Sequence, residues 1–323
     1  MREFGFELAL CATLESEGHL VARQLGASTR GKRVVDTLLV EPGPEFDTRT
    51  AVTRETVPGA AIDADVGVGR WRPERAVRRS VGATGDGPGA DPVERAVERG
   101  FLERERRDGR RVLRQTARYP ERWFGRLVAV ENKPDLDRPG ELYDQLRRDV
   151  ALGAVDAAVL CTASHVTGAH RNRLPEEVGI WRFDPETADR TVLREPEPLA
   201  TDAPGLEILE RRAGRADVRT VSADRKAALR RRLAERAYGK GWRVPFPDCQ
   251  NVETRSVAGV GPLPYCTREQ RFVASEAPCD CPPGEPPEVD LAAHRDRHSP
   301  WVRDPAGGAR RQAGLDRFRS RSR

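Results

Sequence analysis

The sequence is short of lysine and of long hydrophobic runs. Lysine occurs at four of the 323 positions, against 52 arginines. Arginine is a poor substitute for a lysine that must act as a compact charge or lose its proton. The few lysines, and Lys133 in particular, therefore draw attention. No stretch reaches the roughly 20 apolar residues of a membrane-spanning helix. The first residues carry acids and no signal-peptide cleavage site, so we expect a cytoplasmic protein with no membrane partner.

Motifs that define several large enzyme classes are also missing. The sequence contains no phosphate-binding P-loop, no dinucleotide-binding glycine fingerprint and no motif for Ser-His-Asp catalysis. Any catalytic chemistry must therefore come from another arrangement of side chains.

The net charge of +5 comes from the C-terminal end. Residues 303–323 contain seven arginines and two aspartates, which already give +5, so residues 1–302 are formally neutral. We expect residues 303–323 to form a disordered basic tail. Such a tail either binds nucleic acid nonspecifically, through counterion release, or only aids solubility.

The hydrophobic pattern predicts an α/β fold with a mixed sheet flanked by helices. Apolar residues recur at helical spacing near the N-terminus, and Gly18 follows where that helix would end. Continuous runs rich in leucine and β-branched residues predict buried strands. In chain order we expect helix 2–17, strands 33–41 and 126–133, helix 139–152, and strands 156–162 and 178–183.

Residues 42–125 differ in character from the segments on either side. A short helical pattern ends at Gly100, and two strand-like runs flank Asp108-Gly109, a strong signal for a two-residue hairpin turn. A helix followed by a short hairpin resembles the second half of a winged helix, a common DNA-binding unit. The alternative is a plain hairpin subdomain packed on the core.

The strand at residues 126–133 ends in polar residues. Side chains alternate along a strand, so Glu131 and Lys133 share a face and Asn132 lies opposite. A carboxylate there can bind a divalent metal, and the ammonium can orient a water beside it. Asp36 is the natural second carboxylate, because it interrupts an apolar strand where an unpartnered aspartate is unfavourable.

Two carboxylates, a lysine and Mg²⁺ (or Mn²⁺) suit phosphodiester hydrolysis. The alternative is structural. Glu131 and Lys133 would then form a surface ion pair, and Asp36 would accept a hydrogen bond from a backbone amide.

This order of elements and motifs resembles the PD-(D/E)xK nuclease superfamily, which has the restriction-endonuclease-like fold. In that superfamily a helix with a glutamate precedes a strand with an aspartate and a strand with (D/E)-x-K, and a helix and another strand follow. The chain also looks like a member of a domain-of-unknown-function family within it. The matching residues are Glu7, Asp36, Glu131, Asn132 and Lys133.

The resemblance implies a role for each residue at the strand ends. Asp36 and Glu131 would bind Mg²⁺ together with a backbone carbonyl at Asn132. Lys133 would orient the attacking water.

Helix residues complete the implied site. Glu7 would hold a further water or metal, with Glu15 as the fallback. Gln145 matches a glutamine that the RecB-like branch places on the helix after the lysine strand, where it would position the lysine or the phosphate. The tyrosine that often follows one turn later is Asp149 here. The 95-residue separation of the aspartate and glutamate strands also exceeds the usual hairpin spacing.

Four of the six cysteines cluster late in the chain, within 33 residues rich in proline. In a cytosolic protein such a set more often binds metal than forms disulfides, and four thiolates suit structural Zn²⁺. A 4Fe-4S cluster is the alternative, since some RecB-like nucleases carry four cysteines around one. The four residues are Cys249, Cys266, Cys279 and Cys281.

Other metal-binding residue types have simpler interpretations. Cys11 and Cys161 lie in apolar runs and are expected to be small core residues. His294 and His298 are four residues apart near the cysteines. Either could replace a cysteine ligand, although two surface histidines are the plainer interpretation.

Together these patterns predict a metal-dependent nuclease that acts on nucleic acid, with DNA favoured, in repair, recombination or defence. The rival is a non-catalytic DNA-binding protein with a degenerate nuclease fold and a structural zinc module. Nucleases that cut both strands often dimerise, so a homodimer is one assembly to consider.

The expected regions are a nuclease-like core (1–41 and 126–183), an insertion (42–125), an irregular connector (184–222), a basic helix with a cysteine-rich module (223–302, the helix at 223–238), and the tail (303–323).

Overall fold

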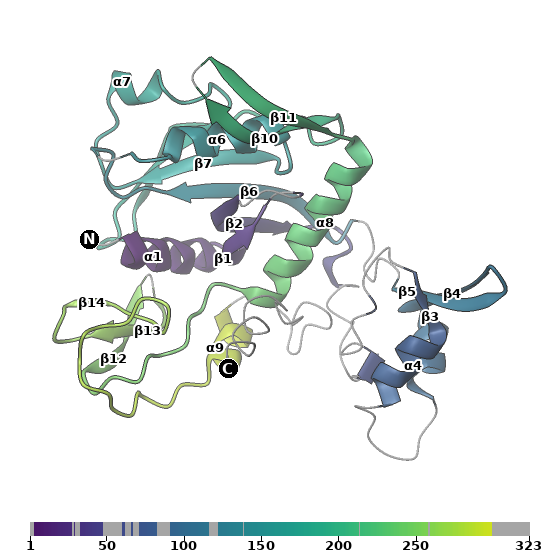
Figure 1. Cartoon of the computed structure of the whole chain (residues 1–323). Coiled ribbons are helices and arrows are strands. Elements are labelled where there is room, and N and C mark those ends of the chain that lie inside the picture. Colours follow the sequence, from purple (N-terminus) through teal and green to yellow (C-terminus); the bar gives the residue numbers. More distant parts are fainter. Residues whose placement is uncertain are drawn as a thin grey trace, which may run out of the picture. The chain divides into compact units, whose positions relative to one another are not determined.

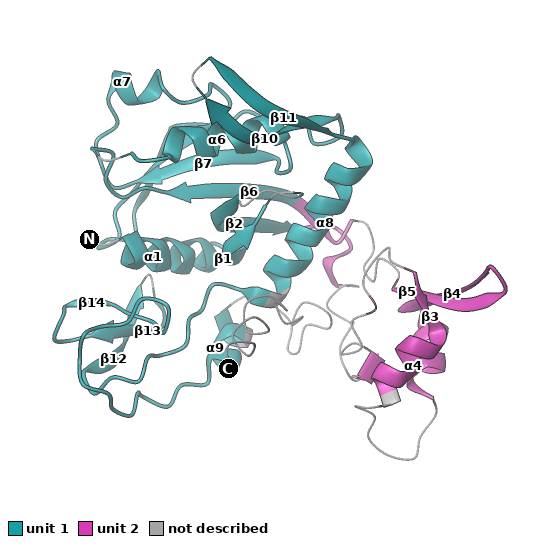
Figure 2. Cartoon of the chain, viewed as in Figure 1, with its two compact units in different colours: residues 1–41, 126–301 teal, residues 42–125, 302–323 magenta. Residues whose placement is uncertain are grey.

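The computed structural model divides the chain into two compact units (Figure 2). Unit 1 comprises residues 1–41 and 126–301, and unit 2 comprises residues 42–125 and 302–323. The expected basic tail lies outside the described residues. The structure describes residues 3–27, 29, 33–47, 60–61, 66, 71–82, 91–115, 122–137, 139–212, 214–257 and 259–298.

Unit 1 is built around a six-stranded mixed sheet with the order β1-β2-β6-β7-β8-β9 (Figure 1). The pairs β1–β2 and β8–β9 are antiparallel, whereas β6, β7 and β8 are parallel to one another. The predicted α/β fold with a mixed sheet flanked by helices is confirmed, and β1 is a strand that the sequence analysis missed. The strands are β1 (Leu20–Gly26), β2 (Val34–Pro42), β6 (Phe124–Asn132), β7 (Ala157–Thr162), β8 (Gly179–Phe183) and β9 (Arg190–Arg194).

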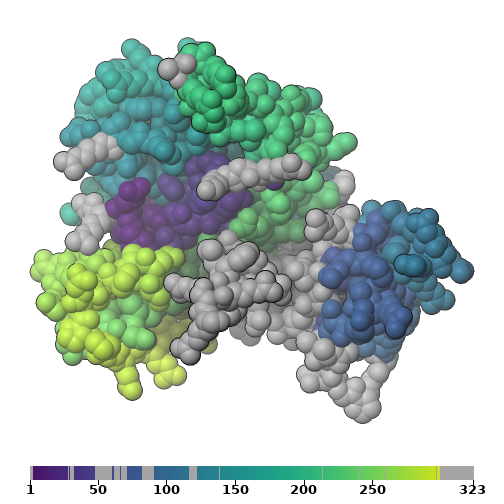
Figure 3. All heavy atoms as spheres, in the orientation of Figure 1, coloured from purple at the N-terminus to yellow at the C-terminus, as the bar shows by residue number. Residues whose placement is uncertain are grey.

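Helix α1 (Glu3–Ser16) is buried on nearly all sides. A helix that is apolar all round needs cover on both sides. One cover is the sheet, because α1 shares a hydrophobic core with Val130 of β6 and Val159 of β7. The other cover is the C-terminal segment, which contributes Val260 and Leu263 to the same core. Figure 3 shows C-terminal residues in yellow-green directly beside N-terminal ones in purple.

Helix α6 (Leu142–Leu152) connects the parallel strands β6 and β7 and ends at Gly153, whose φ of 58° is left-handed. Helix α8 (Ala223–Lys240) packs against β1 and buries Leu229 and Leu233. A short helix, α7 (Gly168–Arg171), follows β7. None of the helices in the described part of the chain is long and apolar enough to cross a bilayer.

The segment at residues 184–222 is not the irregular connector that the sequence suggested. It contains β9 and a separate antiparallel hairpin of β10 (Gly205–Arg212) and β11 (Arg215–Val221). Most residues of this hairpin are exposed or partly exposed. Its strands therefore lack the apolar runs that identified the buried strands, which explains why they were missed.

The cysteine-rich segment is part of unit 1 and not a separate module. It forms a three-stranded antiparallel sheet of β12 (Val252–Val257), β13 (Val260–Cys266) and β14 (Arg271–Phe272), followed by α9 (Leu291–His298). All three strands contact α1. The small sheet lacks enough core of its own, and α1 supplies the apolar surface that it buries.

Unit 2 has a small core beneath a three-stranded sheet of order β3-β5-β4. Asp108 and Gly109 connect its hairpin with φ values of 49° and 74°. These left-handed values are those of the predicted hairpin turn, which is confirmed. The elements are β3 (Arg72–Pro73), α4 (Glu74–Gly82), α5 (Pro92–Glu98), β4 (Leu102–Arg107) and β5 (Arg110–Gln115).

Candidate functional site

The candidate catalytic residues lie where β2 and β6 are neighbours in the sheet. The side-chain amide of Asn132 on β6 donates to Thr37 Oγ1 on β2 at 2.8 Å, and Thr37 Oγ1 lies 3.6 Å from Cys11 Sγ of α1. Thr37 and Asn132 therefore face α1. Because side chains alternate along a strand, the adjacent Asp36 and Glu131 point to the opposite face, as the sequence predicted.

Asp36 is partly buried and accepts hydrogen bonds on both oxygens. Its Oδ2 accepts from the backbone N–H of Asn132 at 2.9 Å, and its Oδ1 lies 3.5 Å from Nε2 of Gln24. Burial raises the pKa of Asp36 to about 6, and the carboxylate of Glu7 adds to the rise. The backbone bond is the one that the structural alternative predicts. The raised pKa indicates that this bond does not compensate for burying the charge.

A buried arginine joins Glu131 to α6. Arg33 Nη2 donates to Glu131 Oε2 at 2.7 Å, and Arg33 Nε donates to Asp149 Oδ1 at 2.9 Å. Burial raises the pKa of Glu131 to about 8 despite the opposing charge of Arg33, and Asp36 adds to the rise. Burial alone would lower the pKa of Arg33, but the Asp149 and Glu131 carboxylates raise it above its ordinary value.

Neither Arg33 nor its pairing with Asp149 was foreseen. The buried positions of α6 are Leu142, Leu146, Asp149 and Leu152, so the aspartate stands in an apolar stripe at helical spacing. A carboxylate in such a stripe indicates a buried cationic partner, and that signal could have been used. Arg33 gave no comparable signal, because it is one of 52 arginines.

Glu7 approaches Asp36 through a shared glutamine. Gln24 Nε2 donates to Glu7 Oε1 at 3.0 Å and is also the group beside Asp36. Arg23 Nη2 donates to Glu7 Oε2 at 2.9 Å and also pairs with Glu276. The fallback residue Glu15 does not take part, because its fully buried carboxylate forms a two-bond ion pair with Arg243, at 2.9 and 2.6 Å.

Lys133 does not pair with Glu131. Its Nζ lies 3.8 Å from Glu3 Oε2, and its side chain is only a quarter exposed (25%). The ion pair that the structural alternative proposed between Glu131 and Lys133 is therefore not formed, since Glu131 pairs with Arg33.

A pocket of about 570 Å³ opens beside Asp36. Helix α6 contributes Gln145 and Arg148 to its lining, and the β10–β11 hairpin contributes Ile208 and Leu209. Gln145 thus faces the same pocket as Asp36. The pocket joins polar groups to an apolar wall, as ligand sites commonly do.

The carboxylates Glu7, Asp36, Glu131 and Asp149, here called the acidic cluster, outnumber their two arginine partners, Arg23 and Arg33. When all are ionised, two negative charges remain in a largely buried region, since Glu7, Glu131 and Asp149 are at most 7% exposed. A divalent cation would balance this charge, and carboxylate oxygens are the ligands that Mg²⁺ prefers. Within the described residues, however, these carboxylates are not gathered as closely as a metal-binding set, and Arg33 holds the Glu131 oxygen that a metal would need.

The four late cysteines, here called the cysteine cluster, do come together. Their sulfur atoms all lie within 4.8 Å of one another, and none forms a disulfide. Tetrahedral Zn²⁺ with Zn–S bonds of about 2.3 Å requires sulfur separations of about 3.8 Å, so this spacing suits a metal. Among the described residues it is the one set of three or more histidine, cysteine or acidic side chains gathered so closely.

Backbone groups support the cysteine cluster. The N–H of Asn251 donates to Cys249 Sγ and the N–H of Glu269 donates to Cys266 Sγ, each at 3.4 Å. Such bonds stabilise thiolates, the form that binds metal. Two pairs of sulfurs lie closest, Cys249–Cys279 at 3.2 Å and Cys266–Cys281 at 3.5 Å.

The remaining candidate ligands lie elsewhere. His294 Nδ1 accepts from Arg243 Nε at 3.1 Å and its ring stacks on His298 at 4.3 Å, so neither joins the cysteine cluster. Cys11 and Cys161 are core residues, as expected, and burial raises the pKa of both thiols.

A family model of proteins of unknown function, DUF5787, matches residues 20–286. The chain belongs to DUF5787. The range that this family covers includes Asp36, Glu131 and Lys133 and all four residues of the cysteine cluster, whereas Glu7 precedes it. No curated protein and no solved structure matches the chain significantly.

Proposed function

We propose that this DUF5787 protein is a metal-dependent nuclease that hydrolyses phosphodiester bonds, with DNA as its substrate. The observation that carries the proposal is the acidic cluster beside the pocket. Asp36 and Glu131 come from neighbouring strands, and burial raises the pKa of both to about 6 and about 8. Carboxylates with such perturbed pKa values are concentrated at functional sites.

The order of elements in unit 1 supports the proposal. Helix α1, strands β1, β2 and β6, helix α6 and strand β7 follow one another along the chain, apart from the insertion before β6. The order that the resemblance implies is a helix with a glutamate, a strand with an aspartate, a strand with (D/E)-x-K, a helix and a strand. Here α1 carries Glu7, and the two motif carboxylates lie on β2 and β6, with β1 as an additional strand.

In the proposed mechanism, Asp36, Glu131 and the backbone carbonyl of Asn132 would hold Mg²⁺ or Mn²⁺. When bound, the metal would stabilise the phosphate charge and lower the pKa of a bound water. Lys133 orients the attacking water, and Gln145, which lines the pocket, positions the phosphate. Gln24 holds Glu7 next to Asp36, where Glu7 keeps a further water in place.

The cysteine cluster supports a second, structural metal, for which we propose Zn²⁺. Four thiols from a small sheet suit a closed tetrahedral site, and a 4Fe-4S cluster is the alternative. Because β12, β13 and β14 all pack on α1, the metal would stabilise the helix that carries Glu7.

Unit 2 supports a winged-helix interpretation of the insertion. Helices α4 and α5 lie between β3 and the β4–β5 hairpin, and β3 pairs with β5. A winged helix has this order of elements. It would give the nuclease a second surface for DNA.

One observation favours the rival function, a DNA-binding protein with a degenerate nuclease site. Arg33 already neutralises Glu131, and Lys133 approaches Glu3 instead of the motif carboxylates. A protein that had lost its metal would be stabilised by such internal pairs.

Cleavage of labelled single-stranded, duplex and branched DNA, with Mg²⁺ or Mn²⁺, separates the two functions. The wild type is compared with Asp36→Asn and Glu131→Gln, and with Asp144→Asn as the matched control. Asp144 is a partly exposed carboxylate on α6 that pairs with Arg211, outside the acidic cluster. Mutation of a residue that hydrogen-bonds to a metal ligand typically reduces activity by about 10–100-fold. Loss of a ligand itself should therefore reduce cleavage by more than about 100-fold. Circular dichroism checks that each variant is folded.

The control variant should cut like the wild type. If folded wild type binds DNA but cuts nothing with either metal, the rival function is correct. If Asp36→Asn and Glu131→Gln cut as well as the wild type, the active site lies elsewhere.

A further inference from the structure

The tip of the β4–β5 hairpin in unit 2 concentrates positive charge. Residues 106–111 read Arg-Arg-Asp-Gly-Arg-Arg, and all six are exposed. Arg106, Arg110 and Arg111 form no ion pair with any carboxylate of the described residues. Arg106 Nε donates to the carbonyl of Gly109 at 3.4 Å, so the tip presents exposed guanidinium groups that no carboxylate of the described residues neutralises at Arg106, Arg110 and Arg111.

The strand register places like charges directly opposite each other at this tip. Arg106 is paired with Arg111, and Arg107 with Arg110. Like charges in directly opposed positions destabilise a hairpin. Farther from the tip the pattern reverses, since Glu103 opposes Arg114 and their side chains form an ion pair. The repulsion is thus confined to the tip, where binding of a polyanion would relieve it.

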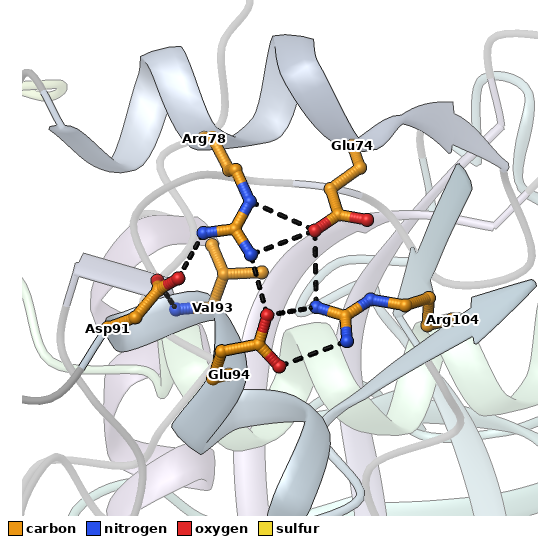
Figure 4. Close-up of polar contacts among 6 residues, drawn as sticks. All are labelled: Glu74, Arg78, Asp91, Val93, Glu94 and Arg104. Atoms are coloured by element: carbon orange, nitrogen blue, oxygen red, sulfur yellow. Dashed lines mark hydrogen bonds and ion pairs between the residues drawn. The ribbon is translucent and has the colours of Figure 1, made fainter. Parts of the chain in front are cut away.

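The base of the hairpin is held by an ion network with the helices (Figure 4). Arg104 Nη1 donates to Glu94 Oε2 at 2.9 Å, and Arg78 Nε donates to Glu74 Oε1 at 2.9 Å. Arg78 also bonds to Asp91, at the start of α5. Three carboxylates face two arginines here. This side of α5 therefore carries excess negative charge and would repel phosphate groups.

An aromatic ring fixes the orientation of two further arginines. The guanidinium carbons of Arg107 and Arg114 lie 4.3 and 4.6 Å from the centre of the Trp71 ring. Such cation–π contacts hold side chains that would otherwise be mobile. The hairpin is therefore held by contacts at its base and along one face, while residues 106–111 at its tip stay exposed.

We propose that residues 106–111 bind the phosphate backbone of duplex nucleic acid, and that the hairpin, not helix α5, is the nucleic-acid-binding element of unit 2. A two-stranded ribbon fits the major groove of DNA, which is about 12 Å wide. Arginine contacts to phosphates account for most nonspecific affinity. A lipid surface is the poorer match, because the tip has no apolar side chain to enter a bilayer. The inference uses unit 2 alone and does not depend on nuclease activity.

The test is fluorescence anisotropy of a labelled mixed-sequence duplex with the full-length protein, without divalent metal so that cleavage plays no part. The variant is the double substitution Arg110→Gln/Arg111→Gln. The matched control, Arg75→Gln/Arg79→Gln, removes the same charge from exposed positions on α4. Both retain residues 303–323, so any contribution of that segment is equal.

The hairpin variant should bind at least about tenfold more weakly, and its slope of log affinity against log salt should be shallower by about 2, close to 0.9 for each lost phosphate contact. The control should bind like the wild type. Because like-charge repulsion is removed, the hairpin variant should also melt at the same or a higher temperature than the wild type. Arg110→Lys/Arg111→Lys should retain most binding.

Equal weakening in the hairpin and control variants would overturn the proposal, since binding would then follow total charge. Unchanged binding in the hairpin variant would also overturn it. So would tighter binding of the wild type to vesicles of phosphatidylcholine and phosphatidylserine than to the duplex.

Discussion

The two candidate metal sites of unit 1 differ in how completely each is assembled. In the cysteine cluster four sulfur atoms lie within 4.8 Å of one another, and backbone N–H groups already donate to two of them. In the acidic cluster, Arg23 and Arg33 stand between the carboxylates and bond to them. The first site needs only to lose protons. The second must also exchange an internal cation for a metal.

Under the proposed function, this difference would correspond to two kinds of metal binding. A site that is complete in the folded chain suits a permanent structural ion. A site in which an arginine holds a ligand suits an ion that enters and leaves, for instance together with a phosphate. Its arginine would stabilise the fold while the metal is absent.

The two sites are also connected. Glu276, close to Cys279 in the chain, pairs with Arg23, which in turn donates to Glu7 of the acidic cluster. The small sheet that holds the cysteines packs on α1, the helix that carries Glu7. A change at the cysteine cluster should therefore reach the acidic cluster.

Removal of metal from the cysteine cluster should have the largest effect on stability. Structural Zn²⁺ binds zinc-finger peptides with about 10–16 kcal/mol of apparent free energy, which becomes folding free energy. A zinc chelator or Cys266→Ser should lower the melting temperature by at least about 10 °C. Elemental analysis should find one zinc per chain in the wild type. Visible absorbance and bound iron would indicate a 4Fe-4S cluster instead.

Cys161→Ala is the control, because Cys161 is buried outside the cluster. It should keep its metal. A metal-free protein that melts like the metal-loaded one would contradict a structural role.

Replacement of Arg33 should have the next largest effect. Arg33→Gln leaves Glu131 and Asp149 without their buried counter-charge, and breaking such a pair removes roughly 3–5 kcal/mol of stability. Mg²⁺ should restore part of this loss, since it can balance the same carboxylates. Thermal melting with and without Mg²⁺ measures both effects.

Arg78→Gln, in the ion network of unit 2, provides the comparison. That variant should not respond to Mg²⁺ more than the wild type does. Equal responses of the Arg33 and Arg78 variants would argue against a metal at the acidic cluster.

The smallest effect should be a pH dependence in Mg²⁺-free buffer. The pKa of Glu131 is about 8 in the folded chain, against an ordinary value of 4.5, so the folded state keeps a proton that the unfolded state releases. The resulting stability is present at low pH and is lost as the pH rises through about 8. Glu131→Gln cannot titrate, so it should gain roughly 3 kcal/mol relative to wild type between about pH 5 and pH 8, at about 1.4 kcal/mol per pH unit over most of this range.

Melting curves of the two proteins across this range measure the gain. A difference that does not change with pH would mean that Glu131 is ionised in the fold throughout.

Local sequence patterns predicted several strands, the face on which side chains of β6 lie, and the cysteine cluster. Continuous apolar runs identified β2, β6, β7 and β8, because strands buried on both faces need such runs. Alternation along β6 placed Glu131 opposite Asn132. Close spacing of the late cysteines predicted that they meet, and their Sγ atoms do so.

The sequence could not predict which residues far apart in the chain contact one another in the fold. Arg33 and Asp149 are 116 residues apart, and nothing local to either specifies their pairing. The β10–β11 hairpin has little buried surface, so its pattern resembled a loop. The cysteine-bearing sheet packs on α1, a helix that is apolar all round. Such a helix must be buried on its second side by another element, but its sequence does not say which segment that is.

The most direct test of the account is Mn²⁺ titration of the zinc-loaded protein at pH 8, followed by electron paramagnetic resonance. The account predicts one saturable Mn²⁺ site per chain that is retained in Asp144→Asn and lost in the double variant Asp36→Asn/Glu131→Gln, while zinc content stays unchanged. Mn²⁺ binding that is equal in the double variant and the wild type would contradict it. So would a folded wild type that binds no Mn²⁺, since the acidic cluster would then be an internal ion network alone.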